Sequence, residues 1–156
     1  MITVRRQDFK RVQVQDESPN LSDLGQYADT PGEGAIDRQV EAYARGEQLE
    51  RGEYRYFNPT LTGEQTGNPD SPREDYQRME AYERGEWCVW GIRASVTVKI
   101  PIGGTSAGGH IRHVVESPGL WGIESDSDES CFDEVFGEES DTLARMLREL
   151  GVKVVD

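Results

Sequence analysis

The sequence predicts an α+β fold in which an antiparallel sheet has two to four helices packed against it. Apolar and polar residues alternate from Trp87 to Ile102, as they do in a long, half-buried strand. Helices are predicted near residues 35–45, 71–84 and 141–150, and shorter strand-like segments follow the long strand. An antiparallel sheet covered by helices accommodates this order of elements.

The N-terminal part of the chain predicts a strand and then a helix. Val12 and Val14 alternate with polar neighbours before a turn at residues 18–20. Apolar residues then recur at helical spacing near 35–45, and Gly46 is a suitable helix stop. Residues 1–20 are a candidate peripheral segment of the domain.

The clearest helix start lies in the middle of the chain. Ser71 is predicted to be the N-cap, with Pro72 at the first helical position and Glu74 completing a capping box. This helix is expected to run to Arg84 and to stop at Gly85.

Two seven-residue segments resemble each other, Glu41 to Glu47 and Glu80 to Glu86. Both carry an Arg-Gly pair, which is typical of a helix end because Gly adopts the left-handed turn there. We interpret both segments as helix ends, and a duplicated functional edge is the alternative.

The C-terminal part predicts a hairpin, a short strand and a helix. A turn at residues 103–109 brings Ile111 to Glu116 back along the long strand, and residues 120–123 are a further strand. The final helix has one apolar stripe and ends at Gly151, before a last apolar segment at 152–155. Its predicted cap is Ser140 or Asp141, and its stripe consists of Leu143, Met146, Leu147 and Leu150.

The length of 156 residues predicts one domain spanning 1–156. The sequence has no apolar stretch long enough to cross a bilayer and no signal-like start, so a cytoplasmic location is expected, in the host cell if a phage encodes the protein. Cys88 and Cys131 are expected to be reduced, buried thiols, and no cofactor is predicted.

Acidic residues dominate the charge of the chain. The net charge of −13 argues against direct binding of nucleic acid and favours a partner with a basic surface. From Glu116 to Asp141 the sequence contains ten carboxylates and no Lys or Arg, and apolar residues are interleaved with them. A purely solvating tail would lack those apolar residues.

The acidic segment predicts a partner-binding surface. If residues 124–128 are extended, alternate carboxylates lie on one side about 6.6 Å apart, a dense negative row like that of DNA phosphates. The alternative is a solvated acidic face that only keeps the protein soluble. The predicted partner-binding residues are Trp121, as the aromatic anchor, and the carboxylates Glu124, Asp126, Asp128, Glu129, Asp133, Glu134, Glu138, Glu139 and Asp141.

Other patterns are weaker. Residues 104–108 match the G-x-S-x-G nucleophile motif around Ser106, but a strand follows where the motif requires a helix, so a hairpin loop is favoured and no catalytic residue is predicted. His110 and His113 are interpreted as surface residues rather than metal ligands. A loose divalent-cation site at residues 124–129 remains an alternative.

Residues 119–130, GLWGIESDSDES, are similar to a segment that recurs in small acidic proteins of phages and other mobile elements. The likeness is weaker at residues 56–59, 68–70 and 85–88. Tyr43 to Gly46, with Leu49 and Gly52, resembles a pattern near the start of DNA-mimic antirestriction proteins, although no residue role is carried over. The resemblance implies inhibition of a host defence system.

These observations lead to the hypothesis of a non-enzymatic inhibitor that binds a basic nucleic-acid-handling surface, such as that of a CRISPR effector or a restriction enzyme. A phage structural or regulatory protein, recognising its partner through the sheet face of residues 87–102, is the first alternative. A divalent-cation-binding module is the second. The sequence predicts no membrane contact and leaves the oligomeric state open.

Overall fold

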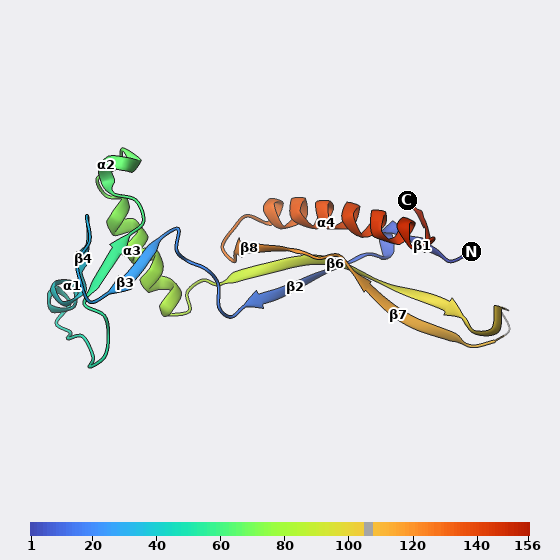
Figure 1. The fold of residues 1–156 in the computed structure, drawn as a ribbon, viewed down its shortest axis with the longest axis horizontal. Coiled ribbons are helices and arrows are strands. Elements are labelled where there is room, and N and C mark those ends of the chain that lie inside the picture. Colours follow the sequence, from blue (N-terminus) through green and yellow to red (C-terminus); the bar gives the residue numbers. More distant parts are fainter. Residues whose placement is uncertain (105–107) are drawn as a thin grey trace. The chain divides into compact units, whose positions relative to one another are not determined.

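The computed structural model describes residues 1–104 and 108–156, which form two compact units. Unit 1 consists of residues 1–17 and 88–156, and unit 2 of residues 18–87. Helices and antiparallel strands are both present, so the predicted α+β class is confirmed (Figure 1). The sequence did not predict the division into two units.

A four-stranded antiparallel sheet organises unit 1. Its central strand is β6, whose first half pairs with β2 on one edge and β8 on the other, while its second half pairs with β7. The predicted long strand and its returning partner are therefore confirmed. The strands are β2 (Lys10–Asp16), β6 (Val89–Pro101), β7 (His110–Glu116) and β8 (Leu120–Glu124), and η2 (Ile102–Gly104) follows β6.

Two short parallel strands bring distant parts of unit 1 together. β1 (Thr3–Arg5) pairs with β9 (Lys153–Val155). The 3-10 helix η1 (Arg6–Asp8) leads from β1 into β2. Residues 3–16 thus contribute two strands to unit 1.

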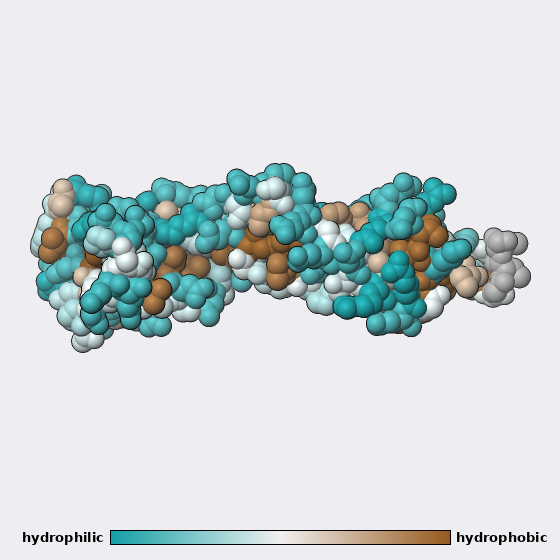
Figure 2. Space-filling view, turned by 90° about the horizontal axis from the view of Figure 1, so that it is seen from above, coloured by the Kyte–Doolittle hydropathy of each residue, from teal (hydrophilic) through white to brown (hydrophobic). Residues whose placement is uncertain are grey.

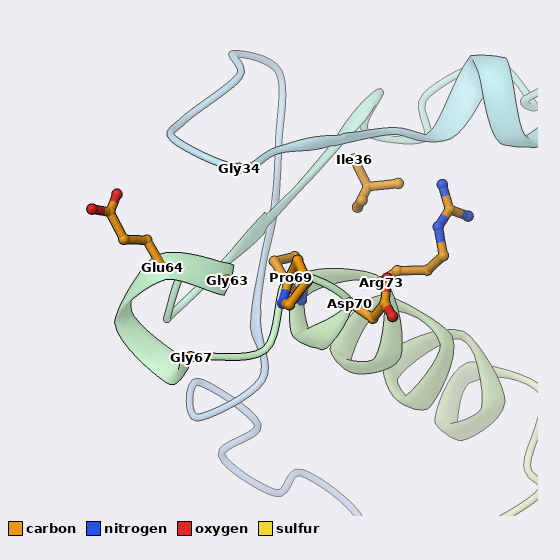
Figure 3. A pocket seen from close by; sticks show the side chains of 9 residues that line it. Gly34, Ile36, Gly63, Glu64, Gly67, Pro69, Asp70 and Arg73 are labelled. Carbon is orange, nitrogen blue, oxygen red and sulfur yellow. The ribbon is translucent and has the colours of Figure 1, made fainter.

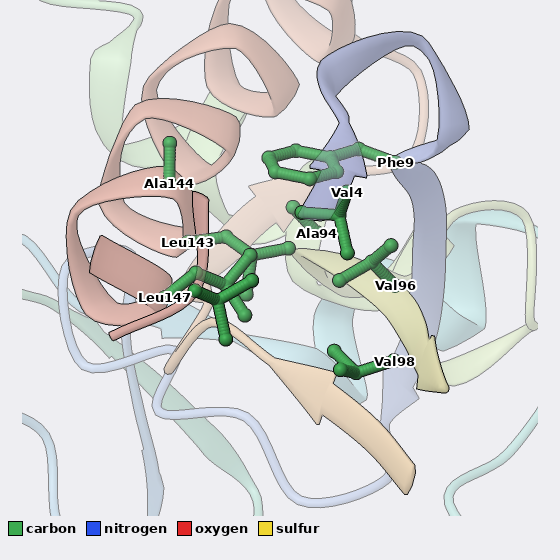
Figure 4. Close-up of a cluster of buried hydrophobic side chains, with 9 residues drawn as sticks. Val4, Phe9, Ala94, Val96, Val98, Leu143, Ala144 and Leu147 are labelled. Carbon is green, nitrogen blue, oxygen red and sulfur yellow. The ribbon is translucent and has the colours of Figure 1, made fainter. Parts of the chain in front are cut away.

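Helix α4 (Glu129–Glu149) covers one face of the sheet. Its buried stripe packs against β1, β6 and Phe9, and a second cluster near its start includes Phe132 and Val135. Figure 4 shows the first cluster, with Leu143 and Leu147 of α4 pointing toward the sheet. Its buried members are Val4, Phe9, Ala94, Val96, Val98, Leu143, Ala144, Leu147 and Val152.

The predicted C-terminal helix is confirmed, but its predicted start is wrong. α4 begins eleven residues or more before the expected cap, with Asp128 as the N-cap and Ser140 buried inside the helix. The apolar stripe continues backward through Val135 and Phe132, and the burial of these side chains outweighs the low helix propensity of Gly137 and the many acidic residues of this part of the helix. The helix ends at Gly151, where φ is +80°, as predicted.

Unit 2 contains a three-stranded sheet with the strand order β3-β5-β4. Its core is a small cluster of Phe57, Tyr76 and Met79. The centre of the Phe57 ring lies 5.8 Å from the centre of the Tyr27 ring and 5.5 Å from that of the Tyr76 ring. Its elements are β3 (Gly25–Ala28), β4 (Ile36–Asp37), α1 (Arg38–Ala44), β5 (Tyr56–Pro59), α2 (Gly63–Thr66) and α3 (Ser71–Glu83).

The predicted helix at 71–84 is present as α3, but Ser71 is not its cap. Asp70 holds the N-cap position, and the Ser71 hydroxyl lies 2.7 Å from the Thr66 hydroxyl instead. A capping box forms one element earlier, between Thr62 and Gln65 at the start of α2. The Ser71 hydroxyl, which the sequence predicted to cap α3, therefore links α3 to α2 through its contact with Thr66.

The two similar seven-residue segments are both helix ends, as interpreted. Arg45 and Arg84 are the C-caps of α1 and α3, and the glycines that follow them, Gly46 and Gly85, both have φ of +73°. The likeness of the segments follows from the common requirements of a helix stop.

Candidate functional site

The predicted extended row of carboxylates at residues 124–128 does not form. Glu124 ends β8, and the chain then turns, with the Ser127 amide donating to the Glu124 carbonyl at 3.0 Å. Ser125 fixes this turn because its amide donates to the Cys88 carbonyl and its hydroxyl accepts from the Cys88 amide. The prediction that residues 124–128 are extended, with carboxylates alternating along one side, is therefore wrong. These hydrogen bonds turn the chain directly before α4.

Most of the predicted carboxylates lie on α4 instead. Residues four apart on a helix are about 6 Å apart along its axis, so Glu129 and Asp133 form one such pair and Glu134 and Glu138 another. The sequence had placed these carboxylates partly on an extended segment. On α4 they form two pairs on different sides of the helix, because consecutive residues such as Asp133 and Glu134 are about 100° apart around the axis. We call the carboxylates of α4 together the acidic row.

Arginines of the N-terminal segment partly neutralise this row. Arg11 lies opposite Ala94, on the face that α4 covers, and contacts Glu129 at 2.9 Å and Asp133 at 3.2 Å. Arg6 forms an ion pair with Asp141. The carboxylate side chains of Glu129, Asp133 and Asp141 nevertheless remain 67%, 70% and 69% exposed, so a partner can still reach them.

Glu139 has a structural role. Its carboxylate accepts from the Ser117 hydroxyl at 2.5 Å and from the Gly119 amide at 2.8 Å. The Ser117 hydroxyl in turn accepts from the Ala94 amide at 2.9 Å, and Ser117 is buried. This chain of bonds joins α4, the β7–β8 turn and β6.

Replacement of Glu139 with alanine is expected to lower the free energy of unfolding by about 1–3 kcal/mol, because it leaves the Ser117 hydroxyl and the Gly119 amide without their acceptor. The neighbouring Glu138→Ala, at an exposed position, is expected to change it by about 0.5 kcal/mol or less. Urea unfolding of both variants tests this. Equal stability of the two would show that Glu139 does not support the fold.

Asp128, Glu134 and Glu138 are exposed, and among residues 1–104 and 108–156 no hydrogen bond or ion pair engages their side chains. Glu124 and Asp126 are exposed as well. Hydrophilic side chains cover much of the surface in Figure 2. Among the predicted partner-binding carboxylates, Asp128, Glu134 and Glu138 are therefore the most available to a partner.

Trp121 lies apart from these carboxylates. Its ring rests on Gly91, where an added methyl group would come within 2.6 Å of the indole, and the side chain is 48% exposed. Gly91 alternates with Ile92, which faces the core under α4, so the indole lies on the other face of the sheet. Trp121 and the carboxylates of α4 therefore do not form one surface.

Unit 2 contains a cavity of about 590 Å³, shown in Figure 3. Glycine and proline supply much of its wall, and the Glu64 side chain points away from it. The Arg73 guanidinium is held by two bonds to Glu41, at 2.8 and 2.9 Å, and this contact lowers the pKa of Glu41.

A buried arginine organises another part of unit 2. Arg38 donates to the Tyr54 carbonyl at 2.6 Å, lies 3.3 Å from Glu80, and stacks 4.3 Å from the centre of the Tyr27 ring. Tyr27 donates to Glu80 at 2.8 Å, and burial, together with this carboxylate, raises the pKa of Tyr27. The network joins α1, α3 and β3.

The remaining candidates from the sequence are Ser106, the two histidines and the two cysteines. Ser106 lies outside the described residues, and His110 and His113 point to opposite faces of β7, opposite Pro101 and Val98. No cluster of three or more potential metal ligands occurs within 1–104 and 108–156. Cys88 and Cys131 are free and half-buried rather than fully buried. In the same residues, no helix combines the length and apolarity required to cross a membrane.

Comparison with family models, curated proteins and solved structures found no match to this chain.

Proposed function

We propose that this protein is a non-enzymatic inhibitor that binds a basic, nucleic-acid-handling surface of a host defence complex, such as a restriction enzyme or a CRISPR effector. The observation that carries the proposal is the acidic surface of α4. Glu134 and Glu138 are exposed, lie about one turn apart, and are not engaged by any residue of the two described ranges.

The carboxylates that pair with arginine add to the negative charge of the same helix. Glu129, Asp133 and Asp141 keep about two thirds of their side-chain area exposed despite their contacts with Arg6 and Arg11. Exposed ion pairs are weak, typically about 0–1 kcal/mol, so a basic partner can compete with these arginines at small cost.

A helix suits the proposed role better than an extended segment would. The helical backbone fixes the positions from which the carboxylates project before a partner arrives, so little backbone conformational entropy is lost on binding. Spacings of about 6 Å along the axis are wider than the axial spacing of about 3.4 Å between charges of one DNA strand, but both are ordered series of negative charge. Complementary charge of this kind mainly accelerates association and weakens with salt.

The proposal is tested by capture from a bacterial lysate that contains active restriction and CRISPR systems. The immobilised protein is expected to retain a nucleic-acid-binding complex that either competing DNA or rising salt releases. Glu134→Gln with Glu138→Gln is expected to retain about tenfold less, equivalent to about 1.4 kcal/mol. The control, Glu33→Gln with Glu64→Gln, removes the same charge from exposed positions of unit 2 and is expected to retain the wild-type amount.

Two results would contradict the proposal. One is a retained partner that neither DNA nor salt displaces. The other is equal retention by the α4 variant and the wild-type protein.

A further inference from the structure

The second half of β6 and most of β7 form a two-stranded ribbon that pairs with no other strand of the described chain. We define the ribbon as residues 96–101 and 110–115. Pairing of β2 with β6 ends at Ser95, opposite Lys10, and β8 pairs only with residues 89–92 of β6. Figure 1 shows β6 and β7 continuing together beyond the end of β2.

The ribbon differs in charge from the rest of the chain. The sequence contains 30 Asp and Glu, yet none of them lies between Trp87 and Val115. Within the ribbon, Lys99 lies directly opposite Arg112, both side chains are exposed, and no carboxylate of residues 1–104 or 108–156 pairs with them. Like charges directly opposite each other on neighbouring strands destabilise a sheet. A bound anion would therefore reduce the electrostatic repulsion between Lys99 and Arg112 in the free protein.

Further hydrogen-bond donors surround this pair on the same face. His110 lies opposite Pro101, two residues from Arg112, and Thr97 lies two residues from Lys99. Apart from Pro101 and Val114, which is 54% exposed, the ribbon side chains of this face can donate hydrogen bonds, and none is a carboxylate. Such a face suits a partner rich in acceptors and negative charge.

The opposite face of the ribbon carries exposed isoleucines, together with the exposed His113, which lies opposite Val98. Ile100 lies opposite Ile111, and these side chains are 37% and 56% exposed, whereas Val98 before them is buried under α4. Ile102 follows at 51% exposure. Exposed apolar side chains can contact thymine methyl groups in the major groove of DNA.

We propose that the ribbon binds duplex DNA, with Lys99 and Arg112 on backbone phosphates. The major groove of B-form DNA is about 12 Å wide and admits a two-stranded ribbon, whereas the major groove of A-form RNA is too narrow. This goes beyond the inhibitor proposal, because the ribbon and the carboxylates of α4 are separate surfaces. A nucleoprotein target offers both a basic protein surface and DNA.

The net charge of −13 does not prevent this contact. The nearest carboxylate along β7 is Glu116, four residues or about 13 Å from Arg112, and it is paired with Arg93 at 3.2 Å. The screening length is about 8 Å at physiological ionic strength, so Glu116 has little effect on the field at Arg112.

Fluorescence anisotropy with a labelled DNA duplex in about 50 mM salt tests the proposal. Lys99→Gln with Arg112→Gln is expected to weaken binding about tenfold or more and to keep or increase stability, since it removes the opposed charges. The wild-type affinity is expected to fall with a log–log salt slope of about −2 to −3, from two or three phosphate contacts. A duplex RNA of the same length is expected to bind more weakly.

The matched control is Arg5→Gln with Lys153→Gln, which removes two exposed cations from β1 and β9 of the same unit. It is expected to bind DNA as the wild type does. No binding by the wild type, equal weakening by the control, or equal affinity for the RNA duplex would overturn the proposal. So would a finding that Lys99→Gln with Arg112→Gln abolishes self-association and leaves DNA binding intact. None of these results depends on Glu134 or Glu138, so the inhibitor proposal fails or stands separately.

Discussion

Replacement of Phe57 with alanine is expected to unfold unit 2. Phe57 is fully buried and lies in β5, the central strand of the small sheet, between the rings of Tyr27 and Tyr76. The backbone of Gly25 also lies close to its ring, since an added methyl group there would be 2.6 Å from it. Loss of a buried Phe side chain costs about 3–5 kcal/mol.

The small size of this core makes the expected effect large. Only Phe57, Tyr76 and Met79 form the buried cluster of unit 2, and small units have little stability to lose. Hydrogen exchange measured by mass spectrometry is expected to show rapid exchange over residues 18–87 in the variant. The control Leu61→Ala, at a side chain that is 47% exposed, is expected to leave exchange unchanged.

This prediction would be contradicted by slow exchange over residues 18–87 in Phe57→Ala. Such a result would mean that other contacts, such as the network around Arg38, hold the unit together without the aromatic cluster.

Replacement of Leu143 with alanine is expected to lower the free energy of unfolding of unit 1 by about 2–5 kcal/mol. Leu143 is fully buried at the centre of the cluster that joins α4 to β1 and β6. Its loss removes apolar contact from both of those strands and leaves a cavity that the surrounding sheet and helix cannot fill without moving.

Urea unfolding followed by helical circular dichroism measures this effect, because α4 is the longest helix described. Leu150→Ala is the matched control, since Leu150 lies at the end of the same helix and is 70% exposed. It is expected to change the free energy of unfolding by about 0.5 kcal/mol or less. Equal effects of the two substitutions would contradict the assignment of Leu143 to the core.

Strong local patterns in the sequence predicted part of the fold. The alternation through β6 is long and regular, and α3 and the end of α4 carry clear stop signals at Gly85 and Gly151. The first half of α4 was missed because its many carboxylates and Gly137 hid an apolar stripe. Phe132, Val135 and Phe136 fall at helical spacing with the later leucines, and this signal could have extended the predicted helix.

Other features depend on contacts between distant residues. The core residue Phe57 lies in a strand of four residues, too short for periodicity to identify. The neutralisation of the acidic row was also missed, although the basic N-terminal segment that includes Arg6 and Arg11 was visible in the sequence. Its pairing with α4 could not be predicted, because it depends on β2 lying beside β6.

The register of β2 and β6 has a consequence for how such a chain can change over evolutionary time. Asp16, at the end of β2, pairs with Val89, at the start of β6, and all of unit 2 is inserted between them. A tight turn could join these two residues and complete an ordinary hairpin. Recombination at this junction can therefore delete unit 2, or replace it with another domain, while every strand pair of the four-stranded sheet in unit 1 is retained.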